Sequence, residues 1–113
     1  TGFGYDAQRR AAQAELLTKL LPQVRDIRRI GAAALDLCRV AEGTVDAYFE
    51  HGINAWDFAA GAIIAREAGA VVRHPGFDKG SADGELTWAA GADLAPAFEK
   101  LLAAHGATDA LRG

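Results

Sequence analysis

Asp57 is the residue of this chain most suited to chemistry by its type and its place. It comes just before Phe58-Ala59-Ala60-Gly61, where small and apolar residues predict the start of a helix. A carboxylate there can cap the helix, because the first amides of a helix have no partner within it. It can also bind a metal, because the helix dipole stabilises the ionised form and Mg²⁺ prefers carboxylate oxygens. The two roles are compatible, and small neighbours would let the helix pack tightly on a sheet.

Two other positions suit a site only in combination with Asp57. Glu50 ends the alternating segment 45–50, which predicts a strand, and alone it is most simply a solvated strand-end residue. Gly31 precedes a new helical pattern and alone is most simply a turn glycine. The remaining candidates for metal or redox chemistry lack the required spacing and are expected to be structural: His51, His74, His105 and Cys38.

The elements that must position these residues alternate along the chain. Segments 1–5, 24–30, 45–50, 70–74 and 86–90 are expected to be strands. Helices are expected over 7–21, 32–41, 57–68 and from Asp93 to about Gly106, with the two central ones mostly buried. The first helix should be capped by Asp6 and the last by Asp93. Their apolar stripes are expected to be Ala7, Ala11, Ala14, Leu17 and Leu21 in the first helix, and Leu94, Phe98, Leu101 and Leu102 in the last. This order predicts an α/β fold, a layered sheet with flanking helices.

Composition narrows the classes of partner. The 113 residues carry 12 basic and 15 acidic side chains, a net charge of −3, which gives no electrostatic reason to expect nucleic acid as a partner. No apolar run approaches the roughly 20 residues of a membrane-spanning helix, so no membrane partner is expected. A single cysteine cannot form an internal disulfide. We therefore expect one cytoplasmic α/β unit.

Three motifs follow one another along the chain. The first is Arg28-Arg29-Ile30-Gly31-Ala32-Ala33-Ala34-Leu35-Asp36-Leu37, and the second is Asp46-Ala47-Tyr48-Phe49-Glu50. The third is Trp56-Asp57-Phe58-Ala59-Ala60-Gly61, followed by Arg66-Glu67-Ala68-Gly69. In this order and spacing the chain resembles the inositol monophosphatase family over roughly residues 1–104, with Thr1-Gly2-Phe3 similar to the strand that opens the family's second half.

The resemblance implies a role for five residues. Asp57 matches an aspartate that binds a catalytic Mg²⁺, and Glu50 matches a glutamate that contacts a substrate hydroxyl. Gly31, Ala32 and Ala33 match a loop that touches the substrate ring, partly through backbone amides at a helix start. Ala32 departs from the family pattern, in which serine or threonine is common, so only backbone contacts are expected there.

Part of the family's metal site has no counterpart in this sequence. Hydrolysis of a phosphate monoester with metals needs several carboxylates around the ions. The family's other ligands are a glutamate and an Asp-Pro-x-Asp-Gly-Ser/Thr motif, whereas the one Asp-Gly here is Asp83-Gly84 in a loop. We therefore expect this chain to be the C-terminal half of a longer αβαβα enzyme, with the N-terminal half absent and no turnover of its own.

The function implied is Mg²⁺-dependent hydrolysis of inositol 1-phosphate, or a similar sugar or polyol phosphate, by metal-activated water. Related families with these motifs act on fructose bisphosphate, histidinol phosphate or nucleotide bisphosphates. An alternative of another class is a non-catalytic module for self-association or protein binding, since residues 1–3 would leave a sheet edge or an apolar face exposed. A homo-oligomer is expected in either case. A small phosphate-binding domain of unrelated fold is the third possibility.

Overall fold

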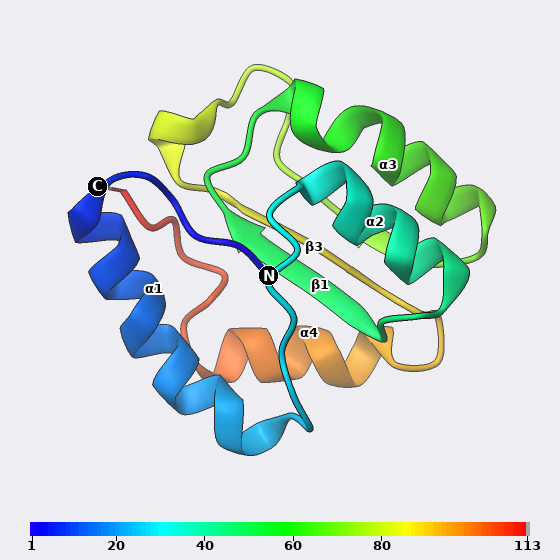
Figure 1. The fold of residues 1–113 in the computed structure, drawn as a ribbon, viewed down its shortest axis with the longest axis horizontal. Helices are drawn as coiled ribbons and strands as arrows, with labels where there is room; N and C mark the ends of the chain where they lie inside the picture. The colour runs from blue at the N-terminus through cyan, green and yellow to red at the C-terminus, as the bar shows by residue number, and fades with distance from the viewer. Residues whose placement is uncertain (113) are drawn as a thin grey trace.

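A three-stranded antiparallel sheet lies at the centre of the chain, and the computed structural model describes residues 1–112 (Figure 1). Its strands are β1 (Ala47–His51), β2 (Val71–Arg73) and β3 (Leu86–Ala90), in the order β1-β3-β2. Within this register Tyr48 lies opposite Ala89, which lies opposite Val72. Because side chains alternate along a strand, these three residues face the same side of the sheet.

Helices cover both faces of the sheet. The helices are α1 (Ala7–Leu20), α2 (Ala33–Glu42), α3 (Ala55–Glu67) and α4 (Ala95–Ala104), with short 3₁₀ turns η1 (Leu21–Gln23) and η2 (Ser81–Asp83). The core against α2 and α3 is built on Leu37, Tyr48, Phe58, Val72 and Ala89. The core on the other face joins α1 and α4 through Leu16, Leu20, Trp88, Phe98 and Leu102. The predicted layered α/β architecture is therefore confirmed.

Two predicted strands are wrong. Residues 24–30 and 1–5 form no ladder with the sheet. Residues 1–5 lie beside β1 but make only isolated contacts with it, such as the hydrogen bond that the Thr1 hydroxyl donates to the Phe49 carbonyl at 2.6 Å. Spacing at every third residue in 24–30 suits neither a strand nor a helix, and the chain there is an extended connection.

The predicted buried face of α1 is also wrong. Its buried residues are Arg9, Gln13, Leu16 and Leu20, whereas Ala7, Ala11, Ala14 and Leu21 are exposed. This helix carries two stripes of residues at helical spacing. The stripe that contains Leu16 and Leu20 buries more apolar area than the predicted, alanine-rich stripe. The polar members of the buried stripe have partners, because Gln13 Oε1 accepts from the Gly4 amide at 2.9 Å.

The start positions of two helices differ from the prediction. The N-cap of α3 is Asn54, so Asp57 is the third helical residue rather than the cap. The N-cap position of α4 is Leu94, and Asp93 does not cap it. The Asp6 cap of α1 is confirmed, since its carboxylate accepts from the Arg9 amide at 2.9 Å.

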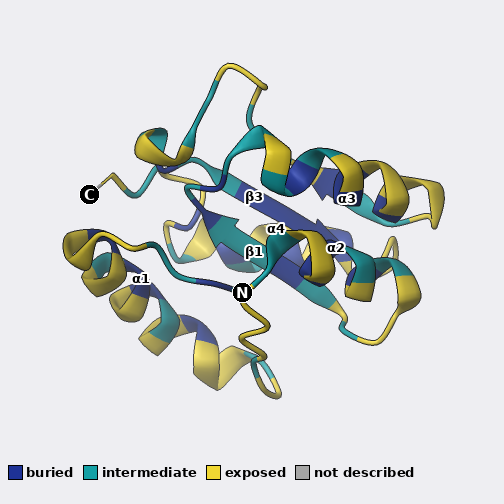
Figure 2. Cartoon of the chain, turned by 45° about the horizontal axis from the view of Figure 1, so that its top comes forward, coloured by how far each residue is buried: buried dark blue, intermediate teal, exposed yellow. Residues whose placement is uncertain are grey.

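The outer faces of α2 and α3 are exposed, which corrects the expectation that both helices are mostly buried. Exposed apolar side chains on them include Leu35, Ile63 and Ile64 (Figure 2). Only one stripe of each helix contacts the sheet or the other helix. No helix in residues 1–112 is both long and apolar enough to cross a membrane.

Candidate active site

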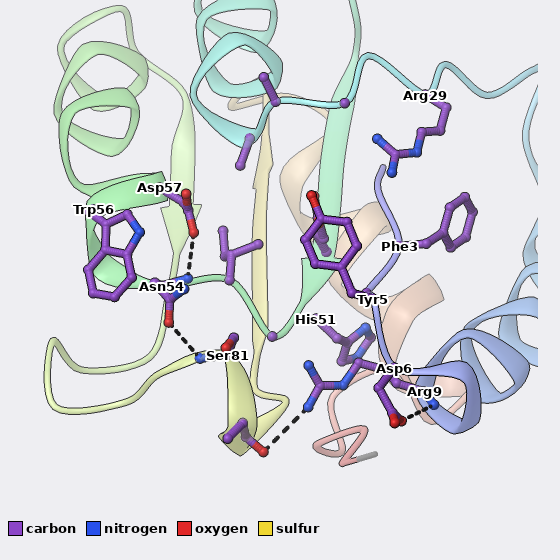
Figure 3. A pocket seen from close by; sticks show the side chains of 18 residues that line it. Phe3, Tyr5, Asp6, Arg9, Arg29, His51, Asn54, Trp56, Asp57 and Ser81 are labelled. Carbon is purple, nitrogen blue, oxygen red and sulfur yellow. Dashed lines mark hydrogen bonds between the residues drawn. The ribbon is translucent and has the colours of Figure 1, made fainter.

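A cavity of about 640 Å³ opens where the N-termini of α2 and α3 meet the end of β1 (Figures 1 and 3). It is lined by all five residues singled out from the sequence: Gly31, Ala32, Ala33, Glu50 and Asp57. They come from three separate segments of the chain. The fold therefore brings the three motifs together at one place.

Asp57 is held by the backbone at the start of α3. Its Oδ2 accepts a hydrogen bond from the Asn54 amide at 2.9 Å. The Asn54 side chain turns away from α3 and accepts from the Ser81 amide at 2.7 Å, which ties η2 to this helix start. The other oxygen of Asp57 accepts no hydrogen bond from residues 1–112 and belongs to a side chain that lines the cavity. One carboxylate oxygen thus fixes the side chain and the other is available to a ligand.

Glu50 lies at the end of β1 and is half-buried. Its Oε1 accepts from the Tyr48 hydroxyl at 2.9 Å. Burial raises the pKa of Glu50 above its usual range, although the hydrogen bond from Tyr48 acts in the opposite direction. The same burial and the neighbouring carboxylate raise the pKa of Tyr48, which therefore stays protonated and donates. This pair makes Glu50 a desolvated acceptor at the edge of the cavity.

The loop before α2 presents backbone rather than side chains. Gly31 has φ +89°, a conformation that side-chain-bearing residues rarely adopt. Ala32 is the N-cap of α2 and has no side chain that could accept from the first amides. The amides at this helix start are consequently available to an oxygen-rich ligand. Because α3 also starts at the cavity, two helix dipoles have their positive ends there, which favours an anion.

The cavity also contains residues that sequence reasoning did not assign to a site. Arg9 is buried and donates from Nε to the Leu111 carbonyl at 2.6 Å and from Nη2 to the Ala82 carbonyl at 3.4 Å. Arg29 lies over the Phe3 ring, 5.9 Å from its centre. Both arginines line the cavity and add positive charge to it (Figure 3). Arg9 carried no signal in the sequence, because it belongs to a stripe that is mostly polar at that end of α1.

The C-terminal segment packs beside the same cavity. His51 donates from Nε2 to the Ala107 carbonyl at 2.7 Å, and burial lowers its pKa. The amide of Leu111 donates to the Gly84 carbonyl at 2.9 Å. The Nε2 atom of His51 is therefore occupied by a backbone contact, and the side chain also lines the cavity.

The donor set of the cavity corresponds to only part of a metal site. In the described chain, no three His, Cys, Asp or Glu side chains are grouped as metal ligands. Asp57, with one oxygen fixed and the other without a partner, fits a single oxygen ligand of a hard cation such as Mg²⁺.

Comparison with known proteins decides the family. Residues 1–110 match the sequence model of the inositol monophosphatase family. The chain belongs to that family.

Its relatives are bacterial proteins that are considerably longer. The inositol-1-monophosphatase of Mycobacterium leprae is 65% identical over 75 residues, which are 66% of this chain and 26% of that protein. The Nus factor SuhB of Pasteurella multocida is 51% identical over 73 residues, 64% of this chain and 27% of that protein. The structure is similar to Mycobacterium tuberculosis SuhB with a TM-score of 0.83 and 47% identity, covering 96% of this chain and 41% of that one. The chain thus spans about a quarter of the curated relatives' length.

Proposed function

We propose that this chain is the C-terminal part of a Mg²⁺-dependent phosphomonoesterase that acts on inositol 1-phosphate or a similar sugar or polyol phosphate. The observation that supports this most is the meeting of three family motifs, from separate segments, at one cavity. Fructose bisphosphate, histidinol phosphate and nucleotide bisphosphates are the alternative substrates, because few residues of this segment discriminate among them.

Asp57 is the residue proposed to hold the metal. Its Oδ2 is kept in place by the Asn54 amide, so the remaining oxygen has a defined position at the cavity. When bound, Mg²⁺ would neutralise phosphate charge and activate a water for attack on phosphorus. The remaining carboxylate ligands are proposed to come from an N-terminal half, and the 113-residue chain alone is expected to have no turnover.

The other lining residues are proposed to bind the substrate. Glu50 is proposed to accept from a substrate hydroxyl, which is supported by its Oε2 accepting nothing from residues 1–112. The amides of Gly31, Ala32 and Ala33 are proposed to donate to substrate oxygens, since they belong to a helix start. Two arginines in the same cavity would further favour an anionic substrate.

Asp57→Asn tests the metal role while keeping the fold. Asparagine retains a carbonyl oxygen for the Asn54 amide but lacks the charge that Mg²⁺ requires, so stability should change by less than about 1 kcal/mol. We expect Mg²⁺ to shift the amide resonances of residues 54–57 in the wild-type chain and not in the variant. In a longer protein that contains this segment, the variant should lose phosphate release from inositol 1-phosphate. Equal Mg²⁺ shifts in both chains would contradict the assignment.

A non-catalytic role in self-association or protein binding is the second candidate. It is favoured by the relatives named Nus factor SuhB and by the exposed apolar side chains of Leu35, Ile63 and Ile64. The relatives named Nus factor SuhB do not confirm the expectation that the chain has no nucleic-acid partner. Sedimentation of the chain with and without Mg²⁺ separates the two candidates. A stable homodimer whose amide resonances do not shift with Mg²⁺ would favour the second candidate function.

A further inference from the structure

Among residues 1–112, the Tyr48 hydroxyl has one side-chain partner, and that partner belongs to the candidate active site. Tyr48 is 1% exposed, and its ring packs in the core between the sheet and α2 and α3. Buried tyrosine hydroxyls need a hydrogen-bond partner, and any backbone carbonyl could supply one. Here the partner is the carboxylate of Glu50, 2.9 Å away, while Tyr48 itself does not line the cavity. The hydroxyl therefore reaches the site only through Glu50.

The first residues of the chain confine the same carboxylate from another side. A side chain at Gly2 would bring its Cβ within 2.5 to 2.8 Å of the three carboxylate atoms of Glu50. Gly2 is kept there because the neighbouring Thr1 hydroxyl donates to the Phe49 carbonyl at 2.6 Å. The backbone of the N-terminal segment thus passes directly against the Glu50 carboxylate, and a side chain at Gly2 would have to displace that carboxylate.

We propose that Tyr48 is a positioning residue, which together with the Gly2 backbone holds Glu50 so that Oε1 is occupied and Oε2 is left for a hydroxyl of a polyol phosphate. The inference rests on the proposed function and adds to it a residue outside the cavity. A carboxylate already held in its binding orientation loses less conformational freedom when the ligand binds. A hydrogen bond to the ionised form also lowers the pKa of Glu50, opposing the larger effect of its burial.

The groups around Glu50 come from several elements. Tyr48 belongs to β1, Asp36 to α2, and Arg29 to the loop before α2. Asp36 disfavours the charged form of Glu50, whereas Arg29 favours it. Removal of the Tyr48 hydroxyl changes only one of these contributions, which makes its effect on the pKa of Glu50 interpretable.

Tyr48→Phe tests this role, because phenylalanine keeps the ring and removes only the donor. The control is Thr44→Val, which removes a hydroxyl that donates to the Arg39 carbonyl in the turn after α2, at the end of that helix away from the cavity. In the 113-residue chain, carboxyl-carbon NMR should show a higher pKa for Glu50 in Tyr48→Phe and no change in Thr44→Val. Titration with myo-inositol should show binding weakened roughly 2- to 10-fold in Tyr48→Phe only, the loss of one net hydrogen bond.

The outcomes separate this inference from the proposed function. Wild-type binding of myo-inositol with equal affinity in Tyr48→Phe would overturn the positioning role and leave the proposed function intact. An unchanged pKa of Glu50 in Tyr48→Phe would also overturn it. No binding of myo-inositol by the wild-type chain would overturn the substrate contact of Glu50, and the positioning role of Tyr48 with it. In a longer phosphatase containing this segment, the variant should raise KM for inositol 1-phosphate with kcat unchanged.

Discussion

Gly61 controls how closely the two helices that start at the cavity approach each other. It lies one turn after Asp57 in α3 and faces Leu37 of α2. A Cβ at Gly61 would lie 2.7 Å from Leu37 Cβ and 2.8 Å from its Cδ1. The helices make the most extensive contact between elements in the described chain, so a change at this point would be transmitted along both.

Two opposing effects determine the result of Gly61→Ala. Alanine is favoured over glycine within a helix by about 1 kcal/mol. Overpacking of a filled core costs about 1–3 kcal/mol, and here one of the close atoms is a Cβ, which cannot rotate away. We therefore expect a net loss of stability of about 1 kcal/mol, which corresponds to a fall in Tm of about 4–8 °C for a domain of this size.

Urea unfolding of Gly61→Ala, Ala60→Gly, Leu37→Ala and the Leu37→Ala/Gly61→Ala double variant separates these effects. Ala60→Gly, at an exposed position next to Gly61 in the same helix, measures the helix preference alone and should cost about 1 kcal/mol. Leu37→Ala in combination with Gly61→Ala removes part of the clash, so the two substitutions together should cost less than their sum. A Gly61→Ala chain that is more stable than wild type would refute the argument that glycine is required for close packing of α2 and α3.

Two further predictions concern the end of β1. Gly52 and Gly43 both have φ +78°, but a Cβ at Gly52 would collide with the Arg9 guanidinium and lie 3.0 Å from the Ser81 carbonyl oxygen, whereas Gly43 has open space. Gly43→Ala should thus cost about 1 kcal/mol in urea unfolding and Gly52→Ala clearly more; equal costs would contradict the collision. Burial lowers the pKa of His51, so the stability that its neutral form contributes is complete above the unfolded pKa of 6.5 and is lost as pH falls through the folded pKa. Stability should therefore decrease more between about pH 7.5 and about pH 5.5 in wild type than in His51→Gln, and parallel curves would show that His51 makes no such contribution.

The sequence was most informative where residue type and local structure point the same way. The alternation of 45–50 predicted β1, and the Leu86–Ala90 strand and the Asp6 cap were also predicted. The five candidate site residues lie in one cavity because each lies at or next to the end of an element whose existence the pattern indicated. The position of an element's end is therefore enough to place a site residue near its neighbours.

Features that depend on tertiary partners could not be predicted from local patterns. The Ser81 amide donates to the Asn54 side chain. This hydrogen bond joins the Asn54 side chain to η2 rather than to α3. Arg9 is buried because carbonyls from residues 82 and 111 accept its hydrogen bonds, and these are remote in sequence. The segment 1–5 looks like a strand by composition, but side-chain contacts with β1 replace a ladder.

The return of the C-terminal segment to the cavity has a practical consequence for work on this protein. The Leu111 carbonyl accepts a hydrogen bond from Arg9, and the Leu111 amide donates one to the Gly84 carbonyl. A purification tag or fluorescent protein joined to that end would therefore lie beside the opening of the cavity, where it would obstruct ligands or distort their measured affinities. A label attached in the turn around Gly43 and Thr44, which is exposed and follows the far end of α2, avoids this interference.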